Sequence, residues 1–109
     1  MFTLAAEPRW TSTVTVRQPG AAPATFTATF RLVAKDQRDK LGGTLEGTEE
    51  LMRLSVVTTE DVVNEAGEVM PFTPELLKLL IANPWVLRGL VNAWADGLAG
   101  FPGAAATGN

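Results

Sequence analysis

Residues 10–32 read WTSTVTVRQPGAAPATFTATFRL, and they contain two runs of alternating side chains on either side of a loop. In residues 10–17 tryptophan, serine and valine alternate with threonine, and in residues 25–32 phenylalanine, alanine and leucine alternate with threonine and arginine. A period of two with β-branched residues predicts strands that bury one face. Prolines and a glycine in residues 18–24 predict the connecting loop. The stretch therefore predicts an antiparallel hairpin with one apolar face and one threonine face.

Because an isolated hairpin is marginally stable in water, its apolar face needs helices from elsewhere in the chain. Thr73-Pro74-Glu75 and Asn83-Pro84 each place a capping side chain before a proline, which is typical of a helix start. Residues 76–81 of the first helix are apolar except for Lys78, and we expect a helix with so wide an apolar surface to be covered on more than one side. The second helix has a single apolar stripe, formed by Leu87, Leu90, Val91, Trp94 and Leu98.

The segment between the hairpin and these helices is expected to hold two shorter helices. The charged residues 35–41 predict a short helix, and the helix is expected to end at the glycine pair Gly42-Gly43. Thr48 precedes two glutamates and a leucine, so it is the expected N-cap of the next helix, which weakens at the β-branched residues 56–59. Residues 61–70 predict two short extended pieces joined by a turn at residues 65–67.

The chain has 109 residues, of which 46% are hydrophobic, so it is long and apolar enough for one folded domain. The predicted fold class is α+β, with the N-terminal hairpin packed against C-terminal helices in a small single domain over residues 1–99. Residues 100–109 are mostly small and have little to bury, which predicts a flexible Gly/Ala-rich tail.

The chain contains no cysteine, histidine or tyrosine. These absences exclude disulfides, zinc fingers, iron–sulfur clusters and histidine-dependent catalytic triads. The acidic residues near Gly67 do not have the spacing of an EF-hand loop, so we interpret them as a solvated turn. The sequence therefore predicts a protein that is not an enzyme and has no catalytic residues, cofactor site or metal site.

The formal net charge is −3, and the sequence pI is about 4.8, which argues against nucleic-acid binding. No apolar run approaches the length of a membrane span, and residues 1–10 lack the pattern of a secretory signal. We therefore expect a protein that binds no membrane and is not secreted.

Excess apolar surface on the helix at residues 73–82, without catalytic groups, indicates protein binding. We predict that the contact surface includes Leu76, Leu79, Ile81 and Trp85, and that it binds either a client or a second copy of the chain. Trp85 lies off the apolar stripe of its helix, and its position fits an interface and the core equally well. Trp94 lies on the stripe and is expected in the core.

Residues 62–75 read VVNEAGEVMPFTPE. A valine pair, an acidic turn with glycine, then Pro-Phe-Thr and a leucine-rich helix resembles the small tail assembly chaperones of long-tailed bacteriophages and prophages. Further segments match that family in order and spacing: Met-Phe-x-Leu at residues 1–4, the strand at 10–17, Pro19-Gly20, the strand at 26–31 and the short helix at 36–41. The chain differs from the family at Thr58-Thr59, where members often carry Gly-Trp.

The resemblance implies a non-enzymatic chaperone in the host bacterial cytoplasm. Such a protein binds the tape-measure protein, keeps it soluble until the tail tube assembles around it, and is absent from the finished virion. The resemblance is compatible with a homo-oligomer and with a longer frameshifted product continuing from residues 100–109. Two alternatives stay open: a structural minor tail protein retained in the virion, and a general protein-binding adaptor unrelated to phages.

Overall fold

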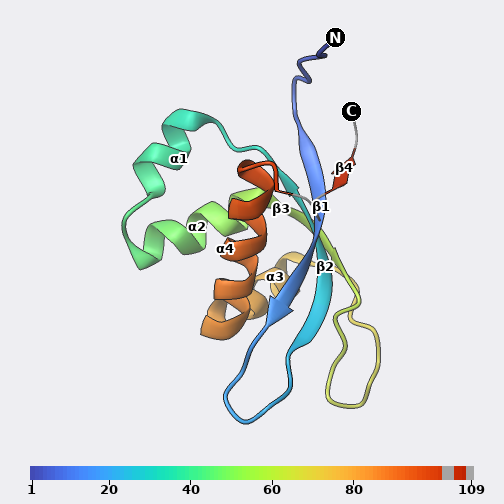
Figure 1. Ribbon diagram of the computed structural model, residues 1–109. Coiled ribbons are helices and arrows are strands. Elements are labelled where there is room, and N and C mark those ends of the chain that lie inside the picture. The colour runs from blue at the N-terminus through green and yellow to red at the C-terminus, as the bar shows by residue number, and fades with distance from the viewer. Residues whose placement is uncertain (102–104, 108–109) are drawn as a thin grey trace.

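The computed structural model describes residues 1–101 and 105–107 and confirms the α+β class in a small domain (Figure 1). Helices lie against one face of an antiparallel sheet with strand order β3-β2-β1-β4. The strands are β1 (Arg9–Val16), β2 (Ala24–Arg31), β3 (Val56–Glu60) and β4 (Ala105–Thr107). The helices are α1 (Lys35–Leu41), α2 (Leu45–Ser55), α3 (Pro74–Ala82) and α4 (Pro84–Leu98).

The β1–β2 hairpin forms as the alternation predicts. Trp10 pairs with Phe30 and Val14 with Phe26, and these side chains are buried on the helix-covered face. The Trp10 and Phe30 rings stack with centroids 5.6 Å apart. Threonines occupy the opposite face, where the Thr11 and Thr29 hydroxyls are 3.0 Å apart and share a hydrogen bond. The period of two therefore separates the core face of the sheet from its polar face.

Residues 56–59 belong to a third strand rather than to a weakening helix. Helix α2 ends at Ser55, and β3 begins at the next residue. β3 pairs antiparallel with β2, with Val56 opposite Phe30 and an irregularity in the register between Thr29 and Phe30. The β-branched side chains end the helix where the free edge of β2 supplies a hydrogen-bonding partner.

The N-cap of α2 is Thr44, and the prediction of Thr48 is wrong. The Thr44 hydroxyl accepts a hydrogen bond of 2.9 Å from the backbone N–H of Gly47. The Thr48 hydroxyl lies within the first turns of the helix and donates to the Thr44 carbonyl oxygen at 2.9 Å. Gly43, with a φ of 97°, reverses the chain after α1, so that the next helix begins one turn earlier than the acidic pattern indicates.

We expect Thr44→Ala to lower the free energy of unfolding by about 1 kcal/mol, because it removes the acceptor of a helix N-terminal N–H. Thr48→Ala deletes only a hydroxyl that bonds back to a carbonyl, and it should change stability by less than half as much. Urea denaturation of the two variants measures both values. An equal or larger loss for Thr48→Ala would contradict the observed cap.

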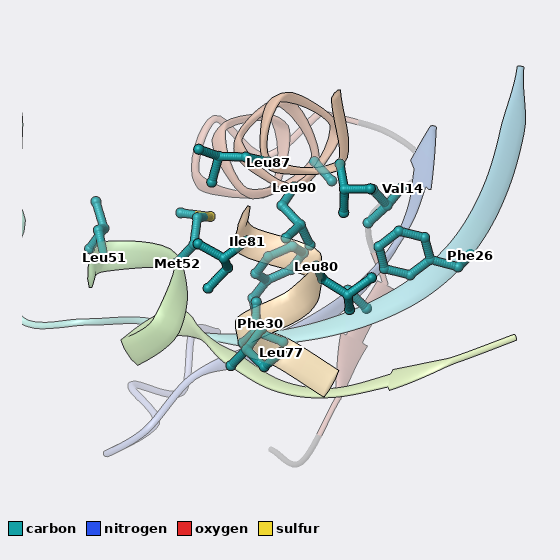
Figure 2. Packing of buried hydrophobic residues seen from close by; sticks show 14 of the residues in the cluster. Val14, Phe26, Phe30, Leu51, Met52, Leu77, Leu80, Ile81, Leu87 and Leu90 are labelled. Atoms are coloured by element: carbon teal, nitrogen blue, oxygen red, sulfur yellow. The ribbon is translucent and has the colours of Figure 1, made fainter. Parts of the chain in front are cut away.

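The core lies between the sheet and the helices, and Figure 2 shows side chains from all these layers meeting there. Phe30, Met52, Leu90 and Val14 are among the most completely buried. α3 contributes Leu76, Leu77, Leu80 and Ile81 from a single side, whereas Lys78 and Leu79 are exposed. The prediction that α3 is covered on more than one side is therefore wrong, because its buried positions recur with helical spacing and leave Leu79 outside.

The buried stripe of α4 differs from the predicted one. Leu87 and Leu90 are in the core as predicted, and Val91 and Trp94 are partly buried and pack against it, but Leu98 is 37% exposed. The buried face also includes Val86, Gly89 and Ala93. Small residues on this face let the helix approach β1 closely, and the larger side chains of the predicted stripe lie toward its margin.

Part of the segment predicted as a flexible tail, residues 100–109, is a strand. Ala105–Thr107 pair antiparallel with Arg9–Thr11 of β1, whereas residues 102–104 and 108–109 lie outside the described residues. Among the helices of the described part of the chain, none combines the length and the apolar character needed to cross a membrane.

Candidate protein-binding surfaces

The four residues predicted to form one contact surface are divided by the fold. Leu76 and Ile81 are buried in the core, whereas Leu79 is 65% exposed and Trp85 is 41% exposed. The α3 helix turns about 100° per residue, so the side chains of Leu79 and its buried neighbours point in different directions. Each exposed residue lies at a different hollow, and a further hollow lies above Ile81.

The first hollow depends on a small hairpin formed by residues 62–70, as the sequence predicts. The Met70 N–H donates to the Val62 carbonyl at 2.8 Å, and the Asn64 N–H donates to the Glu68 carbonyl at 2.9 Å. The Asn64 side-chain oxygen accepts from the backbone N–H groups of Ala66 and Glu68. Gly67 has a φ of 81°, which a side chain at this turn would disfavour. These bonds fix the conformation of the turn.

Apolar side chains of this hairpin and of α3 form an exposed surface. Val63 and Val69 are paired across the hairpin, so their side chains lie on the same side of it, and they are 53% and 70% exposed. Val69 and Leu79 line one hollow of about 400 Å³ together with Met70 and Pro71. We call Val63, Val69, Met70, Pro71 and Leu79 the hairpin–α3 surface.

A second hollow, of about 610 Å³, lies between α2 and α3. Pro74, Ile81 and Ala82 form its apolar side, and charged residues of both helices form its rim. On that rim the Arg53 guanidinium makes two hydrogen bonds to the Glu50 carboxylate. These bonds lower the pKa of Glu50 below its ordinary value. Arg53 and Glu50 therefore satisfy each other's charge and hydrogen bonding on this rim.

The third hollow, of about 240 Å³, lies between α4 and β1 and is mainly polar. Trp85 lies at it with charged and amide side chains of α4 and with hydroxyl groups of β1. We call it the α4–β1 groove; it is lined by Thr13, Thr15, Arg17, Trp85, Arg88, Gly89, Asn92, Ala93 and Asp96. Trp85 therefore lies at a different hollow from Leu79, although the two residues are close in sequence.

Over residues 1–101 and 105–107, no group of three or more acidic side chains is arranged to hold a metal ion. The acidic residues of the 62–70 hairpin are exposed, and the Asn64 amide donates to Glu68 at 3.2 Å.

Val63 and Val69 are candidate contact residues that were not predicted from the sequence. Their signal is the pair of adjacent apolar residues on each side of the turn, Val62-Val63 and Val69-Met70. In an extended strand only one member of such a pair can face the core, so the other must be exposed.

No known protein family matches this chain, and no significant match exists among curated proteins or solved structures.

Proposed function

We propose that this protein is a non-enzymatic phage tail assembly chaperone that binds the tape-measure protein through the hairpin–α3 surface and keeps it soluble in the host bacterial cytoplasm. The observation that carries the proposal is the exposure of Val63, Val69 and Leu79 on neighbouring elements. Two of these residues lie within residues 62–75, the segment that most resembles the tail chaperone family. The resemblance and the exposed apolar surface thus support the same region of the chain.

A tape-measure protein is a long helical chain whose apolar stripes are uncovered until tube subunits surround it. An apolar surface on a chaperone can cover such a stripe, because an amphipathic helix binds by placing its apolar side chains in a hydrophobic depression. Full burial of a valine or leucine side chain contributes about 1.5–3 kcal/mol. Three partly exposed side chains therefore support a modest contact, which tube subunits can displace.

Co-expression with the tape-measure protein encoded in the same phage genome tests the proposal. We expect the wild-type chain to keep that client soluble and to be retained with it in a pull-down. The double variant Val69→Asp/Leu79→Asp should bind at least about tenfold more weakly, because each carboxylate loses hydration when an apolar partner covers it. Both positions are exposed, so the variant should fold normally.

A control variant, Leu4→Asp/Leu45→Asp, adds the same charge at two exposed leucines outside the hairpin–α3 surface. It should keep full client capture, and circular dichroism should show that both double variants are folded. An insoluble client with the wild-type chain would overturn the proposed function. Equal capture by the two double variants would overturn the assigned surface, and recovery of the protein in purified virions would favour a minor tail component instead.

A further inference from the structure

The α4–β1 groove is built by two regular elements that direct polar side chains to one place. Trp85, Arg88, Asn92 and Asp96 are three or four residues apart along α4, so they lie on one face of the helix. Thr13, Thr15 and Arg17 alternate along the chain at β1, so they share the face of the sheet opposite the core. Side chains held by a helix and a strand are better fixed than side chains on loops.

The two ends of the groove differ in charge. α4 and β1 run in opposite directions (Figure 1). Gly89 accordingly lies beside Thr15, and Gly97 lies beside Trp10. Arg17, Trp85 and Arg88 therefore gather at one end of the groove. Asp96 is eight residues beyond Arg88 and lies about 12 Å further along the helix axis. The groove thus has a cationic end with an aromatic ring and an opposite end with one carboxylate.

The cations of the groove are available to a ligand. Arg9, Arg31 and Arg53 each pair with a glutamate, and Arg38 donates to the Val33 carbonyl. Within the described part of the chain, Arg17 and Arg88 take part in no such ion pair or hydrogen bond. Beside them, Trp85 exposes 41% of its surface. Two guanidinium groups next to an exposed indole are characteristic of a site that recognises a carboxylate on an apolar stem.

We propose that the α4–β1 groove binds an extended acidic segment of a partner protein, with one glutamate or aspartate side chain held between Arg17 and Arg88. Trp85 packs against the stem of that side chain. The hydroxyls of Thr13 and Thr15 and the Asn92 amide bond to the peptide groups that follow. Asp96 disfavours a second acidic residue at the far end, which orients the segment. The site lies apart from the hairpin–α3 surface and does not depend on the proposed chaperone function.

A peptide carboxylate fits the groove better than nucleic acid does. Nucleic-acid binding depends on neutralising several phosphates, and this groove offers two guanidinium groups opposed by Asp96 on a chain of net charge −3. Its volume of about 240 Å³ is also below the roughly 300–1,000 Å³ of sites that enclose small-molecule ligands. That space suits a single side chain with its adjoining backbone.

The test is a titration of the whole protein with a blocked hexapeptide, GSEESG, followed by the ¹H–¹⁵N resonance of the Trp85 indole, which Trp85→Phe assigns. We expect a saturable shift that the neutral peptide GSQQSG does not produce and that added salt weakens. Arg88→Gln and Arg17→Gln should each raise the dissociation constant about two- to fivefold, consistent with a partly exposed ion pair. Lys40→Gln, which removes one exposed charge on α1, should leave it unchanged.

Several results would overturn the inference. One is no saturable shift at peptide concentrations up to about 10 mM, where even a very weak site would be occupied. Another is a loss of peptide affinity in Lys40→Gln equal to that in the two arginine variants, which would indicate nonspecific charge attraction rather than binding in the groove. Tighter binding of a single-stranded oligonucleotide at the same indole would make the groove a nucleic-acid site. An indole shift that depends on protein concentration alone would make a second copy the occupant.

Discussion

Replacing Phe30 by alanine is expected to lower the free energy of unfolding by about 3–5 kcal/mol. Phe30 is fully buried and lies on β2, opposite Trp10 of β1 and Val56 of β3, and its ring stacks on that of Trp10. Its side chain therefore lies where the three strands meet the core. Its removal leaves a cavity that the neighbouring strands cannot close without breaking their hydrogen bonds. A domain of this size has a total stability of roughly 5–15 kcal/mol, so the variant should be close to unfolding.

Chemical denaturation with intrinsic tryptophan fluorescence measures this loss. Phe2→Ala is the matched control, because the Phe2 ring is exposed and its removal should change stability by less than about 0.5 kcal/mol. A Phe30→Ala protein with nearly wild-type stability would show that the core is not centred on the β1–β2–β3 sheet.

Replacing Gly89 by valine is expected to lower the free energy of unfolding by about 3 kcal/mol, the upper part of the usual range for overpacking. A first side-chain carbon at position 89 would lie 2.5 Å from the carbonyl oxygen of Thr15 and 3.0 Å from Val14 Cγ1. The oxygen belongs to the backbone of β1, so α4 must move away from the sheet. That movement also opens the contacts of Leu90 with the core.

The direction of the stability change in Gly89→Val distinguishes a close contact with β1 from an effect of helix propensity. In an ordinary helix interior, replacing glycine stabilises the protein, because glycine is the poorest helix former after proline. Ala95→Val on the exposed side of α4 provides the control, and it should cost less than about 1 kcal/mol. Thermal unfolding of both variants distinguishes the two effects. If Gly89→Val matched or exceeded wild-type stability, the close approach of α4 to β1 would be refuted.

Sequence patterns predicted the elements whose signals are local. The alternation in residues 10–32 predicted the hairpin, and Thr73 and Asn83 predicted the starts of α3 and α4; both side chains accept the expected N-cap hydrogen bonds. Such signals succeed because a cap or an alternating strand is stabilised by residues within a few positions of each other.

The patterns were less informative where two local signals competed. Thr44 and Thr48 both resemble N-caps, and the glycine pair that ends α1 placed the helix start at the earlier residue. Residues 56–59 fit a fraying helix or a strand equally well when considered alone. Pairing with β2 made them a strand, because the edge of the hairpin offered hydrogen bonds that a fraying helix end does not.

In the candidate surfaces, too, local patterns predicted some features and packing between distant segments decided the others. The composition of α3 indicated an exposed apolar surface that includes Leu76, Leu79 and Ile81. Leu79 is exposed, but Leu76 and Ile81 are buried by the elements that pack against them. The partners of Leu79 on the surface, Val63 and Val69, come from a hairpin whose position relative to α3 is not encoded in either segment alone. Likewise, the groove at Trp85 exists only because α4 lies along β1.

The composition excludes thiol and imidazole chemistry from the chain. Hydropathy period, caps and turn residues account for the β1–β2 hairpin and for the starts of α3 and α4. They act over a few residues, and a single sequence reveals them. The choice of buried and exposed apolar residues, the third strand and the joining of distant side chains into surfaces depend on packing between segments far apart in the chain. Packing of this kind depends on shape and close approach, as at Gly89 and Thr15, and no local pattern records it.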